Sequence, residues 1–221
     1  MRSTIQEVCQ ITVVGENLEL LPRRAVFWPA KSVLVVTDLH LGKATTFRQN
    51  GIAIPEGSGD QDLWDLTRLI NETRAKRCLI LGDLFHSSYN TFWEKFLRWR
   101  DQVGDTEIEL IKGNHDILEA SDYHAAGLHI HNDNLKIPPF DFKHHPEGGS
   151  PEKAYYRMCG HLHPAVCMKG KGRQYSKLPC FYFGQTESVL PAFGLFTGTS
   201  VIQPEKDDRV FVALKDSVIP V

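Results

Sequence analysis

The stretch Ser32-Val33-Leu34-Val35-Val36-Thr37-Asp38-Leu39-His40-Leu41-Gly42 joins a continuous apolar run to a polar loop. Continuous apolar runs, unlike alternating ones, are typical of strands that are covered on both faces. The pattern recurs twice: the run 78–81 ends at Gly82-Asp83, and the run 107–111 is followed by Gly113-Asn114-His115-Asp116. Ligands of open α/β sheets bind beyond the carboxyl ends of the strands, so we expect three polar clusters at one edge of a sheet.

Helices and further strands are expected around these three runs. Apolar residues recur at helical spacing within 60–73, and aromatic residues give 91–100 a wide apolar face. Short apolar runs at 11–14, 18–21 and 25–28 predict a hairpin and a third strand. Later in the chain short strands dominate, at 128–131, 140–143, 155–158, 165–168, 174–182, 200–203 and 210–214. The chain thus shows an α/β half followed by a β-rich half.

Composition indicates an ordinary globular protein. The 221 residues are 42% hydrophobic and 24% charged, with a net charge of −2. These values exclude a disordered chain and a strongly polycationic nucleic-acid coat protein, and we expect one domain over residues 1–221. The five scattered cysteines indicate reduced thiols. We see no signal peptide and no run of ~18 apolar residues, so a cytoplasmic protein with no membrane partner is expected.

The polar clusters have the composition of a metal site. Carboxylate, imidazole and amide groups together suit borderline divalent ions such as Mn²⁺, Fe²⁺ or Zn²⁺, and the absence of Cys argues against a structural zinc site. Residues i and i+2 of an extended segment share a face, so each Asp-x-His or His-x-His pair should aim two ligands into one site. In chain order the candidates are Asp38, His40, Asp83, Asn114, His144 or His145, His161 and His163.

This series of five motifs (Asp-x-His, Gly-Asp, Gly-Asn-His-Asp, His-His-Pro and Gly-His-Leu-His) resembles the binuclear metallophosphoesterase superfamily, also called calcineurin-like. The string Asp38 to Lys43 with Phe47-Arg48, and the string Leu190 to Gly194, look like those of one bacterial branch, the ligase-associated DNA-damage-response metallophosphoesterases. The similarity extends roughly from Leu18 to Val212. It implies an α/β fold, a four-layer α/β/β/α sandwich of two mixed sheets with helices outside.

The resemblance also implies a ligand set. Two divalent ions are expected, Mn²⁺ by resemblance, with Fe²⁺ or Zn²⁺ as alternatives. The family pattern places the ligand first in the His-His-Pro string, which favours His144 over His145. The first ion would then be held by Asp38, His40, Asp83 and His163, and the second by Asp83, Asn114, His144 and His161, with Asp83 bridging.

The implied activity is hydrolysis of DNA phosphodiester bonds, single-stranded DNA being the expected substrate, by a hydroxide that bridges the two metals. His115 would donate a proton or hydrogen bond to the leaving oxygen, with Asp116 orienting it, and His86 would help to discriminate among phosphoesters. Lys43 and Arg48 are placed to meet phosphate. The family name suggests a role in DNA repair and an association with a DNA ligase and a helicase.

Alternatives remain open for function and for some residues. A hydrolase of small phosphoesters, such as cyclic nucleotides or glycerophosphodiesters, would use the same ligands. A non-catalytic scaffold should have lost ligands, whereas every ligand position here is filled. The basic residues at 169, 171, 173 and 177 could contact a DNA strand or form a solvated hairpin tip. Tyr175, Phe181 and Tyr182 could stack on bases, although such aromatics are more often core residues.

Overall fold

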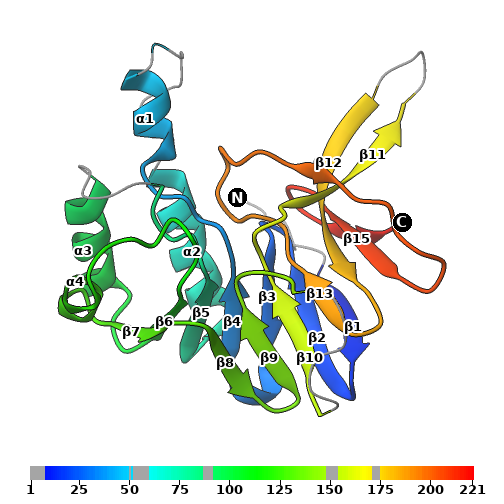
Figure 1. Cartoon of the computed structure of the whole chain (residues 1–221), viewed down its shortest axis with the longest axis horizontal. Helices are drawn as coiled ribbons and strands as arrows, with labels where there is room; N and C mark the ends of the chain where they lie inside the picture. Colours follow the sequence, from blue (N-terminus) through cyan, green and yellow to red (C-terminus); the bar gives the residue numbers. More distant parts are fainter. Residues whose placement is uncertain (1–7, 50, 52–59, 87–91, 148–153, 171–174) are drawn as a thin grey trace, which may run out of the picture.

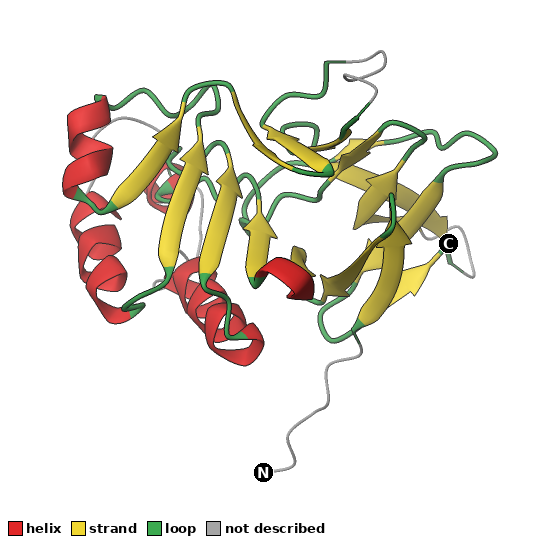
Figure 2. Ribbon diagram, turned by 90° about the horizontal axis from the view of Figure 1, so that it is seen from below, coloured by secondary structure: helices red, strands yellow, loops and turns green. Residues whose placement is uncertain are grey.

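The computed structural model describes residues 8–49, 51, 60–86, 92–147, 154–170 and 175–221. Two mixed β-sheets stand face to face, and helices cover the outer face of the first sheet (Figures 1 and 2). None of the helices in these ranges is long and apolar enough to cross a membrane.

The first sheet holds seven strands in chain order. Strands β1 to β4 pair antiparallel, and β4 to β7 pair parallel. Helices occupy the crossovers between the parallel strands, as βαβ connections require. The strands are β1 (Cys9–Val13), β2 (Glu16–Leu21), β3 (Ala25–Trp28), β4 (Val33–Val36), β5 (Arg77–Leu81), β6 (Glu107–Ile111) and β7 (Leu128–His131). The helices are α1 (Lys43–Gln49), α2 (Asp60–Thr73), α3 (Phe92–Gln102) and α4 (Ala120–Ala125), and a 3-10 turn η1 (Pro29–Lys31) links β3 to β4.

The continuous apolar runs of β4, β5 and β6 are explained by burial on both faces. In β4, Leu34 and Val36 pack against the helical layer, while Val33 and Val35 pack into the core between the two sheets. The second sheet contributes a row of aromatic side chains to that same core, including Phe140, Phe142, Phe181 and Phe183. The chain therefore has two apolar layers, one under the helices and one between the sheets, and strands β4, β5 and β6 lie between them.

The second sheet runs in the order β14-β11-β12-β13-β10-β9-β8, with β15 paired to β12 and β16 to β15. Its strands are β8 (Asn134–Ile137), β9 (Phe140–Lys143), β10 (Tyr156–Cys159), β11 (Pro164–Lys169), β12 (Tyr175–Phe183), β13 (Glu187–Val189), β14 (Ser200–Val201), β15 (Arg209–Ala213) and β16 (Val218–Pro220). Strand β12 passes along β11 first and then between β13 and β15, so one strand joins two parts of the sheet.

The expected α/β class and the two mixed sheets are confirmed, with two differences in detail. All the helices in the described ranges lie before residue 126, and the outer face of the second sheet carries none of them, so the fourth layer is absent from this part of the chain. Strand β7, expected among the strands of the β-rich half, is instead the last strand of the first sheet.

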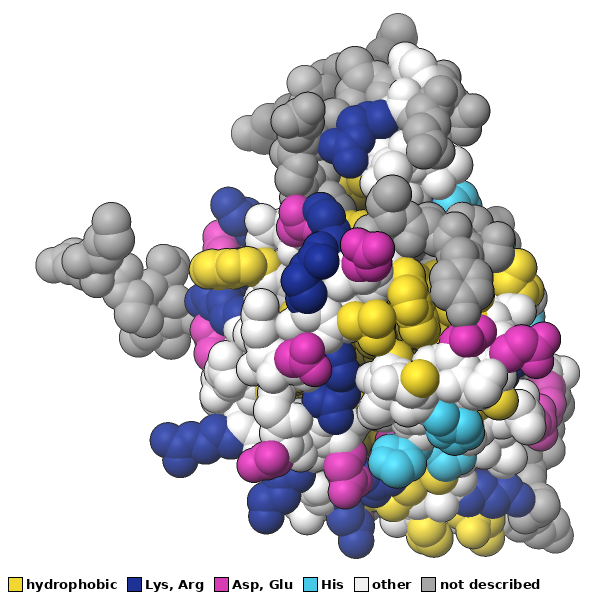
Figure 3. Space-filling view, turned by 90° about the vertical axis from the view of Figure 1, so that its left-hand side faces the viewer, with side chains coloured by type: hydrophobic (Ala, Val, Ile, Leu, Met, Phe, Trp, Pro, Cys, Tyr) yellow, Lys and Arg dark blue, Asp and Glu magenta, His cyan; other side chains and the backbone are white. Residues whose placement is uncertain are grey.

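A groove of about 750 Å³ lies between α2 and α3. Trp64, which is 70% exposed, and Trp99 contribute its apolar surface. Figure 3 shows hydrophobic side chains gathered on this face among both signs of charge. Its flanking charges are paired, Arg68 with Glu72 and Lys95 with Asp60. The groove includes none of the expected metal ligands.

Candidate metal centre

Loops from both sheets meet at the candidate metal centre. Residues 37–40 follow β4, Asp83 follows β5 and Asn114 follows β6, whereas His144 follows β9. The backbone N–H of His40 donates to the carbonyl of Asp83 at 2.9 Å. The N–H of His161, between β10 and β11, donates to the Asp38 carboxylate at 2.9 Å. These bonds bring ligand candidates more than a hundred residues apart in sequence into one cluster.

The ligand loops have an unusual backbone conformation. Asp38, His40, Asp83, His161 and His163 all have positive φ, between 47° and 67°. The expectation that each pair shares the face of an extended segment is therefore wrong, although both pairs do reach the site. Positive φ is uncommon outside glycine, and sparsely populated backbone regions cost of order 1–3 kcal/mol per residue when the surrounding structure imposes them.

The Asp83 carboxylate lies between two groups of ligand candidates. Its Oδ2 atom is 3.6 Å from His40 Nε2, and its Oδ1 atom is 3.5 Å from His144 Nε2. Oδ1 also accepts the backbone N–H of His115 at 3.0 Å. One carboxylate thus presents an oxygen to each of two imidazoles, which is the placement that a bridging ligand requires.

The first group contains Asp38, His40 and His163, whose ligand atoms lie within 4.8 Å of one another. His163 Nδ1 lies 3.1 Å from the carbonyl oxygen of Gly198, and His163 Nε2 lies 3.3 Å from Asp38 Oδ1. Since a carbonyl only accepts, Nδ1 donates its proton to Gly198, and a ring that binds a metal through Nε2 would present that atom's lone pair toward the carboxylate. Both of those facing atoms are buried without a hydrogen-bond partner.

Two electron-pair donors that face each other in a buried site fit a cation between them. Burial lowers the pKa of His40 to about 3, so this imidazole is neutral, as a metal ligand must be. The chemistry of the donors, carboxylate oxygens and imidazole nitrogens, suits Mn²⁺, Fe²⁺ or Zn²⁺. The residues present therefore fit a divalent ion.

The second group contains His144 and His161 next to Asp83 and Asn114. His144 Nδ1 donates to the Leu81 carbonyl at 2.8 Å, which leaves Nε2 facing Asn114 Oδ1 at 3.3 Å and His161 Nδ1 at 3.2 Å. The His144 side chain is buried, whereas the His145 ring is exposed and lies 4.1 Å from the His161 ring, centre to centre. Burial, followed by the neighbouring imidazoles, lowers the pKa of His161.

Asp116 has a different role from the expected one. Both of its carboxylate oxygens accept backbone N–H groups, from Gly113 at 2.9 Å, Asp83 at 2.8 Å and Leu84 at 3.0 Å. The expectation that Asp116 orients the His115 imidazole is therefore corrected, since its oxygens are committed to the backbone. Burial raises the pKa of Asp116 to about 6. Asp116 is a positioning residue that ties the loop after β6 to the loop after β5.

His115 and His86 lie beside the first group. Their rings stack with centroids 5.7 Å apart and planes inclined by 22°, and the His115 ring is 5.2 Å from that of His40. Lys43 opens α1 and lines a small cavity with His40, and burial lowers the pKa of its ammonium group. Arg48 lies in the last turn of α1, which projects from the sheet edge (Figure 1), and donates to Thr45 Oγ1 at 3.4 Å. The structure thus brings His86, His115 and Lys43 to the cluster, and it places Arg48 farther along the helix.

A segment from the C-terminal half, residues 190–198, braces the first motif. The N–H groups of Phe193 and Gly194 donate to the carbonyls of Thr37 and Asp38 at 2.8 and 3.2 Å. The half-buried Arg24 guanidinium donates to the carbonyl of Ala192 at 3.1 Å. The sequence singles out the string Leu190 to Gly194 but does not show that it supports the loop of Thr37 and Asp38. The available signal was its Pro and Gly content, which indicates an irregular segment without saying what it contacts.

The fold and the cluster define a class, the metal-dependent phosphoesterases. The family model of the calcineurin-like phosphoesterases matches residues 31–205, and the chain belongs to this family. It is similar to the nuclease MPE of Pseudomonas putida, with 28% sequence identity and a TM-score of 0.80 over 97% of this chain and 100% of that one. That likeness agrees with the resemblance to the ligase-associated branch.

Two further solved structures are less similar to this chain. The phosphoesterase Yfce of E. coli has 15% identity and a TM-score of 0.45 over 86% of this chain and 97% of that one. A protein of unknown function from Aquifex aeolicus has 15% identity and a TM-score of 0.42 over 64% and 82% of the two chains. A comparison with curated proteins finds no match.

Proposed function

We propose that this phosphoesterase is a nuclease that hydrolyses phosphodiester bonds of single-stranded DNA at a centre of two divalent ions, Mn²⁺ being the expected metal. The observation that carries the proposal is the Asp83 carboxylate, which presents one oxygen to His40 and the other to His144. The first ion is assigned to Asp38, His40, Asp83 and His163, and the second to Asp83, Asn114, His144 and His161.

His144 is preferred to His145 as the ligand of the second ion. Its ring is held by the Leu81 carbonyl in the tautomer that offers Nε2 to the cluster. A fixed tautomer of this kind is usual for histidines that bind metals. When bound, the two ions supply charge neutralisation at the phosphoryl oxygens and activation of the attacking water.

The chain's own residues supply the remaining roles. His115 is fixed through its backbone N–H on Asp83 and stacks on His86, so its imidazole can give a hydrogen bond or proton to the leaving oxygen. Lys43 has its charge near Asp38, Asp83 and His86 and can contact a phosphate that flanks the cluster.

One observation supports a polymeric substrate over small phosphoesters. The chain is similar over nearly all of its length to a protein named as a nuclease. A role in DNA repair, with a ligase and a helicase as functional partners, rests on the sequence resemblance and is proposed with it.

The test is cleavage of linear and circular single-stranded DNA with Mn²⁺, beside bis-p-nitrophenyl phosphate. We expect both substrates to be cut, EDTA to abolish both activities, and His115→Ala to reduce them ~10²- to 10⁴-fold. His129→Ala, at an exposed histidine of β7, is the matched control and should match the wild type. Cleavage of the small diester without cleavage of DNA would overturn the nuclease proposal and favour a hydrolase of small phosphoesters.

A further inference from the structure

Strands β11 and β12 form a ribbon that extends beyond the body of the second sheet (Figure 1). Strand β11 begins at Pro164, directly after the metal-ligand candidate His163. Its register with β12 is unbroken, from Ala165 opposite Pro179 to Lys169 opposite Tyr175. The outer residues of the ribbon are exposed on both strands. Residues 171–174 lie outside the described ranges.

The two faces of this ribbon can be assigned from strand alternation. Side chains of a strand alternate between faces, and directly opposed residues of antiparallel strands share a face. Along β12, Phe181 and Phe183 point into the core between the two sheets, so Tyr175 and Lys177 lie on that same inner face. Lys169, opposite Tyr175, shares it. At the base of the ribbon this face packs in the core between the two sheets, through Phe181 and Phe183, and its outer part is exposed.

The outer face of the ribbon is chemically different. Val166 and Leu178 lie on it and pack against Cys180, in a small apolar cluster with Val210 and Val212. Met168 and Ser176 continue this face outward. A hairpin that is merely solvated has no reason to sort its charges. In the described part of this ribbon, both lysines and the exposed tyrosine lie on the inner face.

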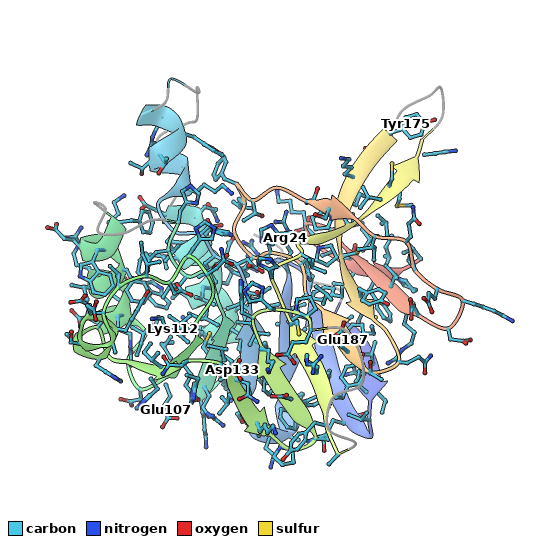
Figure 4. All side chains as sticks on the ribbon, in the orientation of Figure 1. Arg24, Glu107, Lys112, Asp133, Tyr175 and Glu187 are labelled. Atoms are coloured by element: carbon cyan, nitrogen blue, oxygen red, sulfur yellow. The ribbon has the colours of Figure 1, made fainter. Side chains whose placement is uncertain are left out.

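The inner face has the chemistry of a nucleic-acid contact. Tyr175 is 63% exposed near the end of the ribbon (Figure 4), and Lys169 Nζ lies 5.9 Å from the centre of its ring. The segment 164–183 contains four Lys and Arg residues and no Asp or Glu, in a chain with a net charge of −2. Cations that follow a backbone, combined with aromatic rings on which bases stack, are the usual combination for binding single strands.

We propose that the inner face of the β11–β12 ribbon holds the DNA strand beside the metal centre, with Lys169 and Lys177 on its phosphates and Tyr175 stacked on an unpaired base. The proposal rests on the nuclease function proposed above and adds a binding surface to it. Lys169 lies six residues past His163, which is ~20 Å along a strand. The ribbon therefore contacts nucleotides away from the cleaved bond, and a small diester at the metals does not reach it.

The test compares a long and a short substrate. Tyr175→Ala, Tyr175→Phe and the double variant Lys169→Gln/Lys177→Gln are assayed with Mn²⁺ on a labelled single-stranded oligonucleotide and on bis-p-nitrophenyl phosphate. Binding of the oligonucleotide is followed by fluorescence anisotropy in a His115→Ala background at several salt concentrations. Ser176→Ala, on the outer face, and Lys206→Gln, an exposed lysine elsewhere, are matched controls.

We expect Tyr175→Ala to lower oligonucleotide affinity ~5- to 150-fold, the equivalent of one stacked base, and Tyr175→Phe to retain it. The double lysine variant should bind the oligonucleotide more weakly. The slope of the logarithm of the association constant against the logarithm of the salt concentration should be shallower by ~1.4, or ~0.7 for each lost phosphate contact. Hydrolysis of the small diester should stay unchanged in all of these variants, and both controls should behave as wild type.

Three results would overturn the ribbon proposal, and they have different consequences for the nuclease function proposed above. If wild-type protein cleaves the oligonucleotide and the ribbon variants bind and cleave it equally well, the ribbon assignment fails while the nuclease function stands. If the variants lose both activities in parallel, the ribbon acts on the centre itself and is not a strand-binding surface. If wild-type protein hydrolyses only the small diester and does not bind DNA, both proposals fail.

Discussion

Replacing Gly113 by alanine should damage the metal centre directly. A Cβ atom at this position would collide with Asp83 Oδ1 and lie 2.6 Å from the Asp83 backbone nitrogen and 3.0 Å from His144 Cε1. The backbone contact leaves no flexible atom to move aside. We therefore expect the Asp83 carboxylate to be displaced from its place between His40 and His144.

The size of the effect follows from the contacts. Overpacking of a well-packed site costs ~1–3 kcal/mol. Displacing Oδ1 also removes the hydrogen bond from the His115 N–H, and a bond to a charged group contributes ~1.5–3 kcal/mol. The free energy of unfolding should fall by the sum of these two terms, about 2.5–6 kcal/mol. Changing the outer partners of metal ligands costs ~10- to 100-fold in affinity, so displacing a shared ligand should weaken Mn²⁺ binding at least ~100-fold.

Urea unfolding in EDTA measures the structural cost, and calorimetric titration with Mn²⁺ measures the affinity. Gly198→Ala is the matched control, because a Cβ at Gly198 meets nothing within 4 Å and the carbonyl that contacts His163 is retained. Its unfolding free energy should stay within ~0.5 kcal/mol of wild type. Wild-type Mn²⁺ affinity in Gly113→Ala would refute the assigned role of the Asp83 carboxylate.

Three further predictions concern pH, metal and ligand choice. Burial raises the pKa of Asp62 to about 7, so this group stabilises the fold at low pH and the contribution is lost as pH rises through about 7. Asp62→Asn should therefore gain stability relative to wild type at pH 8 but not near pH 4. If the free energies of unfolding of the variant and the wild type differ by the same amount at both pH values, the prediction is wrong. Mn²⁺ at a hundred times its Kd should raise the free energy of unfolding by about 2.7 kcal/mol per site, and a urea midpoint unaffected by Mn²⁺ would exclude binding to the native state. His144→Ala should weaken Mn²⁺ binding far more than His145→Ala, and the reverse order would make His145 the ligand.

The architecture of the first sheet is readable from the sequence because its central strands are buried on both faces. The apolar run of residues 107–111 and the helical spacing within 60–73 agree with the bounds of β6 and α2. Strands β8, β13 and β16 escape prediction because they hold only three or four residues and no pronounced apolar run marks them in the sequence. Nor does local sequence state that β7 joins the first sheet, since sheet membership is decided by distant pairing.

The candidate ligands are readable because each follows a strand in a short motif of few residue types. The backbone conformation of these ligands cannot be read from the sequence, since positive φ at Asp38 or His163 is imposed by neighbours from other loops. The hydrogen bonds of Asp116 are equally hidden, because its three donors come from two loops about thirty residues apart. Alternation shows that Tyr175 and Lys177 share a face, but only the burial of Phe181 shows which face it is.

The brace formed by residues 190–198 has a consequence for how the protein is made. Every candidate ligand has been synthesised once His163 leaves the ribosome, but the backbone donors for Thr37 and Asp38 come from Phe193 and Gly194. The His163 ring receives its partner carbonyl only with Gly198. We therefore expect nascent chains that end before residue 190 to hold metal poorly despite a full set of ligands. The phosphoesterase centre is completed only when the last strands of the second sheet are being made.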